Sequence, residues 1–137
     1  MRPFPETNNA LVLRTDFSDD DAWKSICEAI QKPVGVFQAH VDLLSQPEYD
    51  DITPEEILIA AIDTKRTYLF VVDRITLAHP DRPILCIDLF HQPGRTFRLI
   101  PSEMWGVENN LSIANMEFFE FASATDQDGI FRGFPGE

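Results

Sequence analysis

Short apolar runs alternate with amphipathic segments along most of the chain. The runs rich in apolar and β-favouring residues predict strands at 10–15, 34–41, 67–72, 84–87 and 95–100. Residues 18–31 carry apolar side chains at helical spacing, and we expect Ser18 to cap this helix. Residues 53–56 (Thr-Pro-Glu-Glu) combine a cap, an early proline and a capping box, which predicts the start of a second helix.

This order of elements favours a single α/β domain over residues 1–137, which is the usual size of one domain. We expect two or three layers, with a mostly parallel sheet of about five strands flanked by helices. The strands around Pro93-Gly94 are close enough in sequence to pair antiparallel. Residues 1–8 are expected to form an N-terminal extension, and residues 126–137 a C-terminal tail that packs against the domain.

The region after residue 100 has a weaker pattern. Residues 101–105 predict a short helix that ends near Trp105, whereas 106–110 read as a loop or a frayed turn. Asn115 is expected to cap a final helix.

The net charge of the chain restricts its possible partners more than its overall composition does. The chain has 23 acidic and 11 basic residues, a net charge of −12, which repels nucleic-acid phosphates and anionic lipid headgroups. We therefore expect neither nucleic acid nor a membrane as a partner. No apolar run has the length of a signal peptide or a membrane span, so we expect a cytoplasmic protein. Cys27 and Cys86 lie in apolar patterns and are best interpreted as buried free thiols, with a disulfide or a nucleophile as the alternatives.

Four strand candidates run into an aspartate, namely Asp16, Asp42, Asp73 and Asp88. If these strands are parallel, their carboxylates gather at one edge of the sheet, where open α/β sheets bind ligands. Asp16, Asp73 and Asp88 would then form a Mg²⁺ site, with an arginine to neutralise the charge of the substrate. The alternative is that aspartate only ends strands and starts turns, because its side chain bonds to its own backbone.

Sequence signatures of common catalytic sites are absent. The chain has no GxSxG motif, no glycine-rich phosphate loop and no histidine or cysteine pair at zinc spacing. A conventional hydrolase or nucleotide-binding enzyme is therefore disfavoured.

Two kinds of segment have the composition of a recognition surface. Residues 105–110 (Trp-Gly-Val-Glu-Asn-Asn) place an aromatic ring beside an acid and two amides. The alternative is an anchored loop, with Trp105 in the core and Asn109 and Asn110 bonded to the backbone. The acidic runs 19–21 and 48–51 could attract a basic protein, and an exposed Tyr49 would serve as its anchor.

Three stretches carry a resemblance to a known family: residues 13–20 with Trp23, residues 95–98 through 105–116, and residues 128–134. With these stretches the chain resembles a family of small, mainly bacterial proteins known only as a domain of unknown function. The resemblance spans most of the chain, and Glu108-Asn109-Asn110 is its most specific part. It implies a single-domain cytoplasmic protein and adds weight to a site at Asp16, Trp105 and residues 108–110.

We therefore predict a non-enzymatic, acidic module that needs no cofactor and recognises a protein partner of basic character, as an immunity protein or an inhibitor does. The expected binding residues are Asp16, Tyr49, Trp105, Glu108, Asn109 and Asn110. The alternative function is a Mg²⁺-dependent enzyme that uses Asp16, Asp73 and Asp88. A third possibility is a structural subunit of an oligomer.

Overall fold

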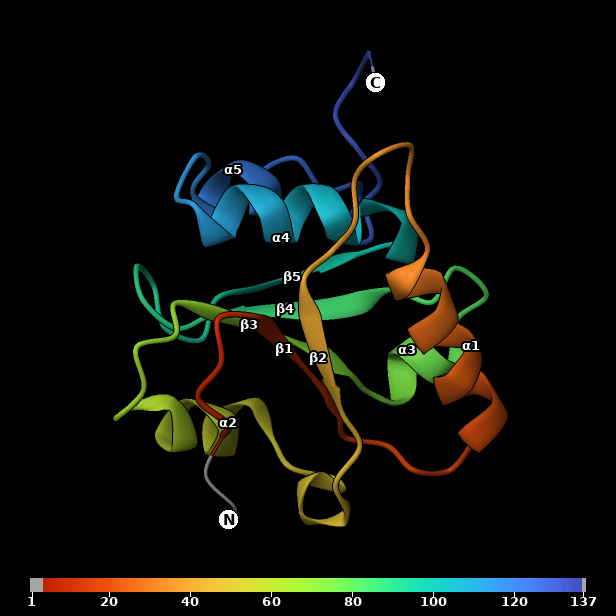
Figure 1. Ribbon diagram of the computed structural model, residues 1–137, viewed down its shortest axis with the longest axis vertical. Coiled ribbons are helices and arrows are strands. Elements are labelled where there is room, and N and C mark those ends of the chain that lie inside the picture. Colours follow the sequence, from red (N-terminus) through yellow and green to blue (C-terminus); the bar gives the residue numbers. More distant parts are fainter. Residues whose placement is uncertain (1–3, 137) are drawn as a thin grey trace.

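A six-stranded mixed sheet with helices on both faces forms the body of the computed structural model, which describes residues 4–136 (Figure 1). The elements follow one another as β1 (Ala10–Arg14), α1 (Asp20–Gln31), β2 (Val41–Leu44), η1 (Pro47–Tyr49), α2 (Pro54–Ala61), β3 (Tyr68–Val72), α3 (Arg74–Ala78), β4 (Ile84–Asp88), β5 (Thr96–Leu99), η2 (Pro101–Glu103), α4 (Met104–Ser112), α5 (Phe118–Ala122) and β6 (Ile130–Phe131).

The predictions of an α/β fold and of an antiparallel strand pair around Pro93-Gly94 are confirmed. The sheet, however, is mixed and not mostly parallel, and it has six strands instead of about five. The strand order is β2-β1-β3-β4-β5-β6. β1 is parallel to β2 and β3, β4 is antiparallel to β3 and β5, and β6 is parallel to β5. The β3–β4 connection holds only the short helix α3, so the chain turns back on itself instead of crossing over the sheet. The sixth strand comes from the C-terminal tail.

The second predicted strand, at 34–41, is misplaced. The sheet strand β2 starts at Val41, and residues 34–37 instead form a tight turn in which Val34 and Phe37 exchange backbone hydrogen bonds of 2.9 and 3.0 Å. Gly35 has φ +62°, a backbone conformation that favours glycine. The apolar alternation that suggested a strand therefore lies in an exposed turn, and the Val36 side chain is 92% exposed.

Alternating strand residues form a core on each face of the sheet. On one face α1, α4 and α5 pack against residues that include Val12, Phe70 and Cys86. On the other face α2 packs with Phe4 and Tyr49 against residues such as Leu11. In the view of Figure 1, α4 and α5 lie above the sheet and α2 lies below it.

Helix starts confirm some sequence signals and correct others. The capping box of Thr53 and Glu56 is present at α2, but Asp19, not Ser18, caps α1. Residues 106–110 are not a loop, because α4 runs through them and buries Met104 and Val107 on one side.

Apolar residues near both ends of the chain are buried. They are Phe4 in the predicted extension, and Ile130 and Phe131 in the predicted tail. Residues 1–3 and 137 of these two predicted segments lie outside the described residues. Glu117 caps α5 in place of the expected Asn115.

The two cysteines are free thiols, and Cys86 is fully buried. Burial raises the pKa of the Cys27 thiol to about 11, which leaves little thiolate at neutral pH. No helix within residues 4–136 is long and apolar enough to span a membrane.

Candidate functional site

Two acidic loops that are distant in the sequence meet where β1 ends. The backbone N–H of Asp51 donates to the carbonyl of Thr15 over 2.7 Å, which holds the loop after β2 beside the loop after β1 (Figure 1). We call this surface the acidic edge. Its carboxylates are those of Asp16, Asp19, Asp20, Asp21, Glu48, Asp50 and Asp51.

A buried arginine organises the centre of the acidic edge. Arg14, the last residue of β1, is 4% exposed, and its guanidinium pairs with exposed Asp20 at 2.6 Å. The same guanidinium lies 4.4 Å from the centre of the Phe17 ring and 5.4 Å from that of Trp23. Cation–π contact with a desolvated arginine holds both rings in place. Phe17 is only partly buried, so the acidic edge contains a fixed aromatic surface.

Asp16, the first predicted site residue, lies on the acidic edge. Hydrogen bonds from the Ser18 hydroxyl and backbone N–H lower the pKa of Asp16, and the charge of Arg74 adds to this effect. The carboxylate is therefore ionised at neutral pH and contributes to the negative field of the surface.

Asp73 follows β3 at the same edge but serves the fold. It caps α3 through the Thr76 backbone N–H, and Arg98 of β5 donates two hydrogen bonds to its carboxylate, at 2.7 and 3.0 Å. Burial alone would raise the pKa of Asp73, but the bonds and the charge from Arg98 outweigh it, so the pKa lies below its ordinary value.

Asp88 lies at the opposite edge of the sheet. It pairs with Tyr68, the first residue of β3, whereas Asp73 follows the last residue of that strand. The three carboxylates of the predicted Mg²⁺ site therefore do not meet, because β4 runs antiparallel to β3. Asp88 is 2% exposed and accepts backbone hydrogen bonds from Phe90, His91 and Gln92. Within residues 4–136, no group of three metal-ligating side chains is close enough to hold a metal ion.

The depressed pKa of Asp73 predicts an acid-dependent contribution to stability. We expect Asp73→Asn to lower the free energy of unfolding by about 2 kcal/mol at pH 7, because Arg98 loses a charged partner. The ionised carboxylate stabilises the fold above its unfolded pKa of about 4, and this stability is lost as the pH falls through the lower folded value. Urea unfolding of the two proteins between pH 7 and pH 2.5 should show the difference shrinking below about pH 4. Asp81→Asn, in an exposed pair with Arg132, should change little.

Residues 105–109 of α4 hold the turn at residues 33–40. Trp105 stacks on Phe37 with ring centres 4.6 Å apart, and Asn109 Nδ2 donates to the Gln38 carbonyl over 3.1 Å. Glu108 is 2% exposed and accepts a hydrogen bond from the His40 backbone N–H. Residues 105–109 thus bond to the backbone, as the structural alternative for this segment expects, but they do so from a helix and not from a loop.

Asn110, the last predicted residue of that segment, shapes the turn after α4. Its Nδ2 donates to the Gly106 carbonyl, and its Oδ1 accepts from Asn115 Nδ2 over 2.8 Å. The backbone carbonyl of Asn110 also accepts from the N–H groups of Asn115 and Met116. The side chain thus has a structural role at the helix end.

Tyr49 is not the exposed anchor that the sequence predicts. Its side chain is 0% exposed, and its ring meets the edge of Phe4 with centres 5.9 Å apart. η1 turns Tyr49 inward while its neighbours Glu48 and Asp50 remain exposed. Tyr49 therefore packs in the core beneath the acidic edge and does not form part of its surface.

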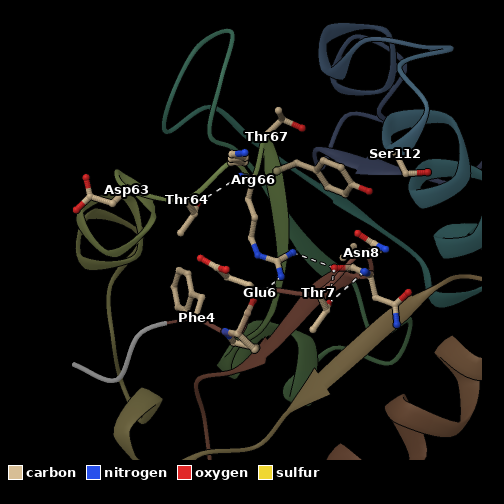
Figure 2. Close-up of a pocket in the computed structure, with 14 residues that line it drawn as sticks. Phe4, Glu6, Thr7, Asn8, Asp63, Thr64, Arg66, Thr67 and Ser112 are labelled. Atoms are coloured by element: carbon tan, nitrogen blue, oxygen red, sulfur yellow. Dashed lines mark hydrogen bonds between the residues drawn. The ribbon is translucent and has the colours of Figure 1, made fainter.

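Three adjoining hollows lie at the edge of the sheet opposite the acidic edge, where β1 and β3 begin. The first, of about 610 Å³, lies between residues 4–10, residues 63–68 and Ser112 (Figure 2). The second, of about 310 Å³, shares Thr67 and Tyr68 with it and is otherwise lined largely by apolar residues. The third, of about 410 Å³, shares Asp88, His91 and Glu117 with the second. We call these hollows together the trough.

Sequence reasoning missed both Phe17 and Arg66. The Arg66 side chain extends from the start of β3 to the N-terminal segment, where it donates to the carbonyls of Pro5 and Asn9 at 2.7 and 2.9 Å (Figure 2). Lys65-Arg66 is the one pair of adjacent basic residues in this acidic sequence, a signal that could have drawn attention to it.

Comparisons of the sequence with known proteins and protein families identify the family of the chain. A search of curated proteins found no match. A family model for a domain of unknown function matches residues 9–134, which include β1 to β6, the acidic loops and the α4 segment. The resemblance seen in the sequence is thereby confirmed, and the chain belongs to the family described as domain of unknown function DUF6924.

Proposed function

We propose that this protein is a binding module that recognises a basic protein partner through the acidic edge. The observation that carries the proposal is the backbone bond between Asp51 and Thr15, which joins two acidic loops into one surface. Either loop alone has the composition of an ordinary solvated turn. Together they concentrate seven carboxylates at the carboxyl ends of β1 and β2.

Electrostatics supports a partner of basic character. Carboxylates within about 10 Å of one another add their potentials at physiological salt, so a cationic surface is attracted before contact is made. The net charge of −12 strengthens this attraction at longer range when the ionic strength is low. An immunity- or inhibitor-like protein that neutralises a basic target is the form of module we propose.

Phe17 gives the acidic edge an apolar contact as well as charge. Interfaces gain most of their affinity from a few fixed aromatic and arginine side chains surrounded by polar residues. Arg14 holds the Phe17 ring from one side, and this partly buried residue lies in sequence between Asp16 and the aspartates at 19–21. A partner that presents an arginine or an apolar side chain to this ring would gain from both features.

Charge reversal on the acidic edge tests the proposal. Asp21 and Asp50 are exposed, and no hydrogen bond of either side chain within the described residues holds the fold. We expect Asp21→Lys with Asp50→Lys to weaken partner binding at least about tenfold, because attraction becomes repulsion. The measurement is affinity capture of the tagged proteins from their native cell extract at low and moderate salt, followed by titration of the captured partner.

A matched control distinguishes an effect of the acidic edge from an effect of the net charge of the protein. Asp63→Lys with Asp128→Lys makes the same change of charge at exposed positions away from the acidic edge. This control should keep the partner that the wild type captures. Equal retention by both double variants, or a captured partner without a basic surface, would contradict the proposal.

A further inference from the structure

The first two hollows of the trough together have one polar, cationic end and one apolar end. At the polar end Arg66 uses two of its five N–H groups to bind backbone carbonyls, which are neutral acceptors. None of the ion pairs among residues 4–136 includes Arg66. By contrast, the more deeply buried Arg14 and Arg98 each pair with a carboxylate. The nearby Asp42 carboxylate, which accepts hydrogen bonds from Thr7 and Asn9, offsets part of the charge of Arg66 but forms no ion pair with it. The guanidinium therefore keeps N–H donors for an anion.

The surroundings of Arg66 favour an anion over a cation. Lys65 adds a second positive charge beside the first hollow, and the hydroxyl of Thr67 supplies a neutral hydrogen-bonding group. Glu6 and Asp63 also line this hollow, but both are exposed side chains that water screens. Partial burial lowers the pKa of Arg66, yet a guanidinium stays charged at neutral pH.

The apolar end lies in the second hollow. Phe90, Leu111, Met116 and Phe118 line it, and Phe90 is 64% exposed at its rim. Two carboxylates also line this hollow: Asp88, which accepts three backbone N–H groups, and Glu117, which is exposed to water. Ile113, next to the lining residue Ala114, is 74% exposed. Large apolar side chains that surround a hollow of about 310 Å³ form a pocket of the size that encloses one small ring system.

Tyr68 connects the two ends. It lines both hollows, and its hydroxyl donates to the Glu108 carbonyl over 3.4 Å. Burial raises the pKa of Tyr68, and the nearby Glu108 charge raises it further, so the phenol stays neutral at physiological pH. A neutral ring between a cationic end and an apolar end adds no charge that would repel an anion.

We propose that the trough binds a small organic anion with an apolar body, such as an aliphatic or aryl carboxylate. The anionic group contacts Arg66, and the apolar body occupies the hollow between Phe90 and Met116. The site lies at the edge opposite the acidic edge, so it is independent of the proposed protein partner.

The test uses two dyes that share one apolar body. 1-Anilinonaphthalene-8-sulfonate carries an anionic group, and N-phenyl-1-naphthylamine lacks it. We expect saturable fluorescence enhancement of both dyes by the native wild-type protein, with one site each. Arg66→Gln should weaken binding of the sulfonate dye about tenfold or more, because a charged hydrogen bond is lost, and should leave the neutral dye unchanged.

Further variants keep the test decisive if Arg66→Gln loosens the N-terminal segment. Thr67→Asp places a carboxylate at the junction of the hollows while Arg66 keeps its bonds, and should reduce binding of the sulfonate dye alone. Phe90→Glu changes an exposed rim residue and should weaken both dyes. Arg74→Gln, an equal loss of charge at the opposite edge, should change neither. Unsaturable enhancement, or equal sulfonate-dye affinity in wild type, Arg66→Gln and Thr67→Asp, would overturn the proposal.

Discussion

Replacing Tyr49 by alanine should lower the free energy of unfolding by about 3–5 kcal/mol. The ring is 0% exposed within the core on the α2 face, and its removal leaves a cavity beside Phe4, Leu11 and Ile57. Truncation of a buried aromatic residue loses both the transfer free energy of the ring and its packing contacts. Urea unfolding monitored by circular dichroism gives this value directly.

Tyr49→Phe is the matched control for this prediction. It keeps the ring and its edge contact with Phe4, so the expected loss is about 1 kcal/mol or less. If Tyr49→Ala were as stable as the wild type and only partner binding fell, Tyr49 would be the surface anchor that the sequence suggested. Because Glu48 and Asp50 flank the ring, we also expect the alanine variant to disorder part of the acidic edge.

Glu108→Ala should be the next most destabilising change, with an expected loss of about 2–4 kcal/mol. The buried carboxylate accepts from the His40 N–H and from Asn109 Nδ2 at 3.0 Å, and it lies 3.4 Å from His40 Nδ1. Alanine leaves a cavity and removes the acceptor of the His40 N–H. Hydrogen exchange should become faster across residues 33–40, which α4 no longer holds.

Two variants define how specific this effect is. Glu108→Gln keeps an acceptor oxygen for the His40 N–H and should cost less than alanine does. Asn109→Ala removes the bond to the Gln38 carbonyl and should cost about 1 kcal/mol. Unchanged exchange of residues 33–40 in Glu108→Ala would show that the α4 segment does not anchor this turn, and would restore its interpretation as a recognition surface.

Local signals predicted the elements well where a short stretch determines the structure. The cap, proline and glutamates at 53–56 form the start of α2 because their hydrogen bonds lie within one turn of helix. The apolar run of β3 and the turn at Pro93-Gly94 are likewise local. These features depend on neighbouring residues, so the sequence alone contains enough information to predict them.

The direction of the strands and the burial of side chains were predicted less well, because both depend on residues that are distant in the sequence. Asp73 and Asp88 each follow an apolar run, yet they lie at opposite edges because β4 reverses direction. Acidic neighbours made Tyr49 look exposed, although its turn places the ring against Phe4. Gly106 and two asparagines suggested a loop, but burial of Met104 and Val107 holds the segment in a helix.

For the same reason, the sequence predicted only some of the residues of the candidate sites and not how they come together. Each acidic run was recognised, but the bond between Thr15 and Asp51 that joins them could not be predicted from composition. The trough combines segments from the N-terminus, the start of β3 and the end of α4, which no sequence pattern connects.

A hydrogen-exchange footprint of the captured complex tests the central claim most directly. Amide exchange would be compared for the wild-type protein alone and with its partner bound. We expect protection in the loops at residues 15–21 and 46–56 and little change along residues 63–68 and 112–119. Protection confined to the trough, with exchange in both acidic loops unaltered, would contradict the assignment of the acidic edge as the partner-binding surface.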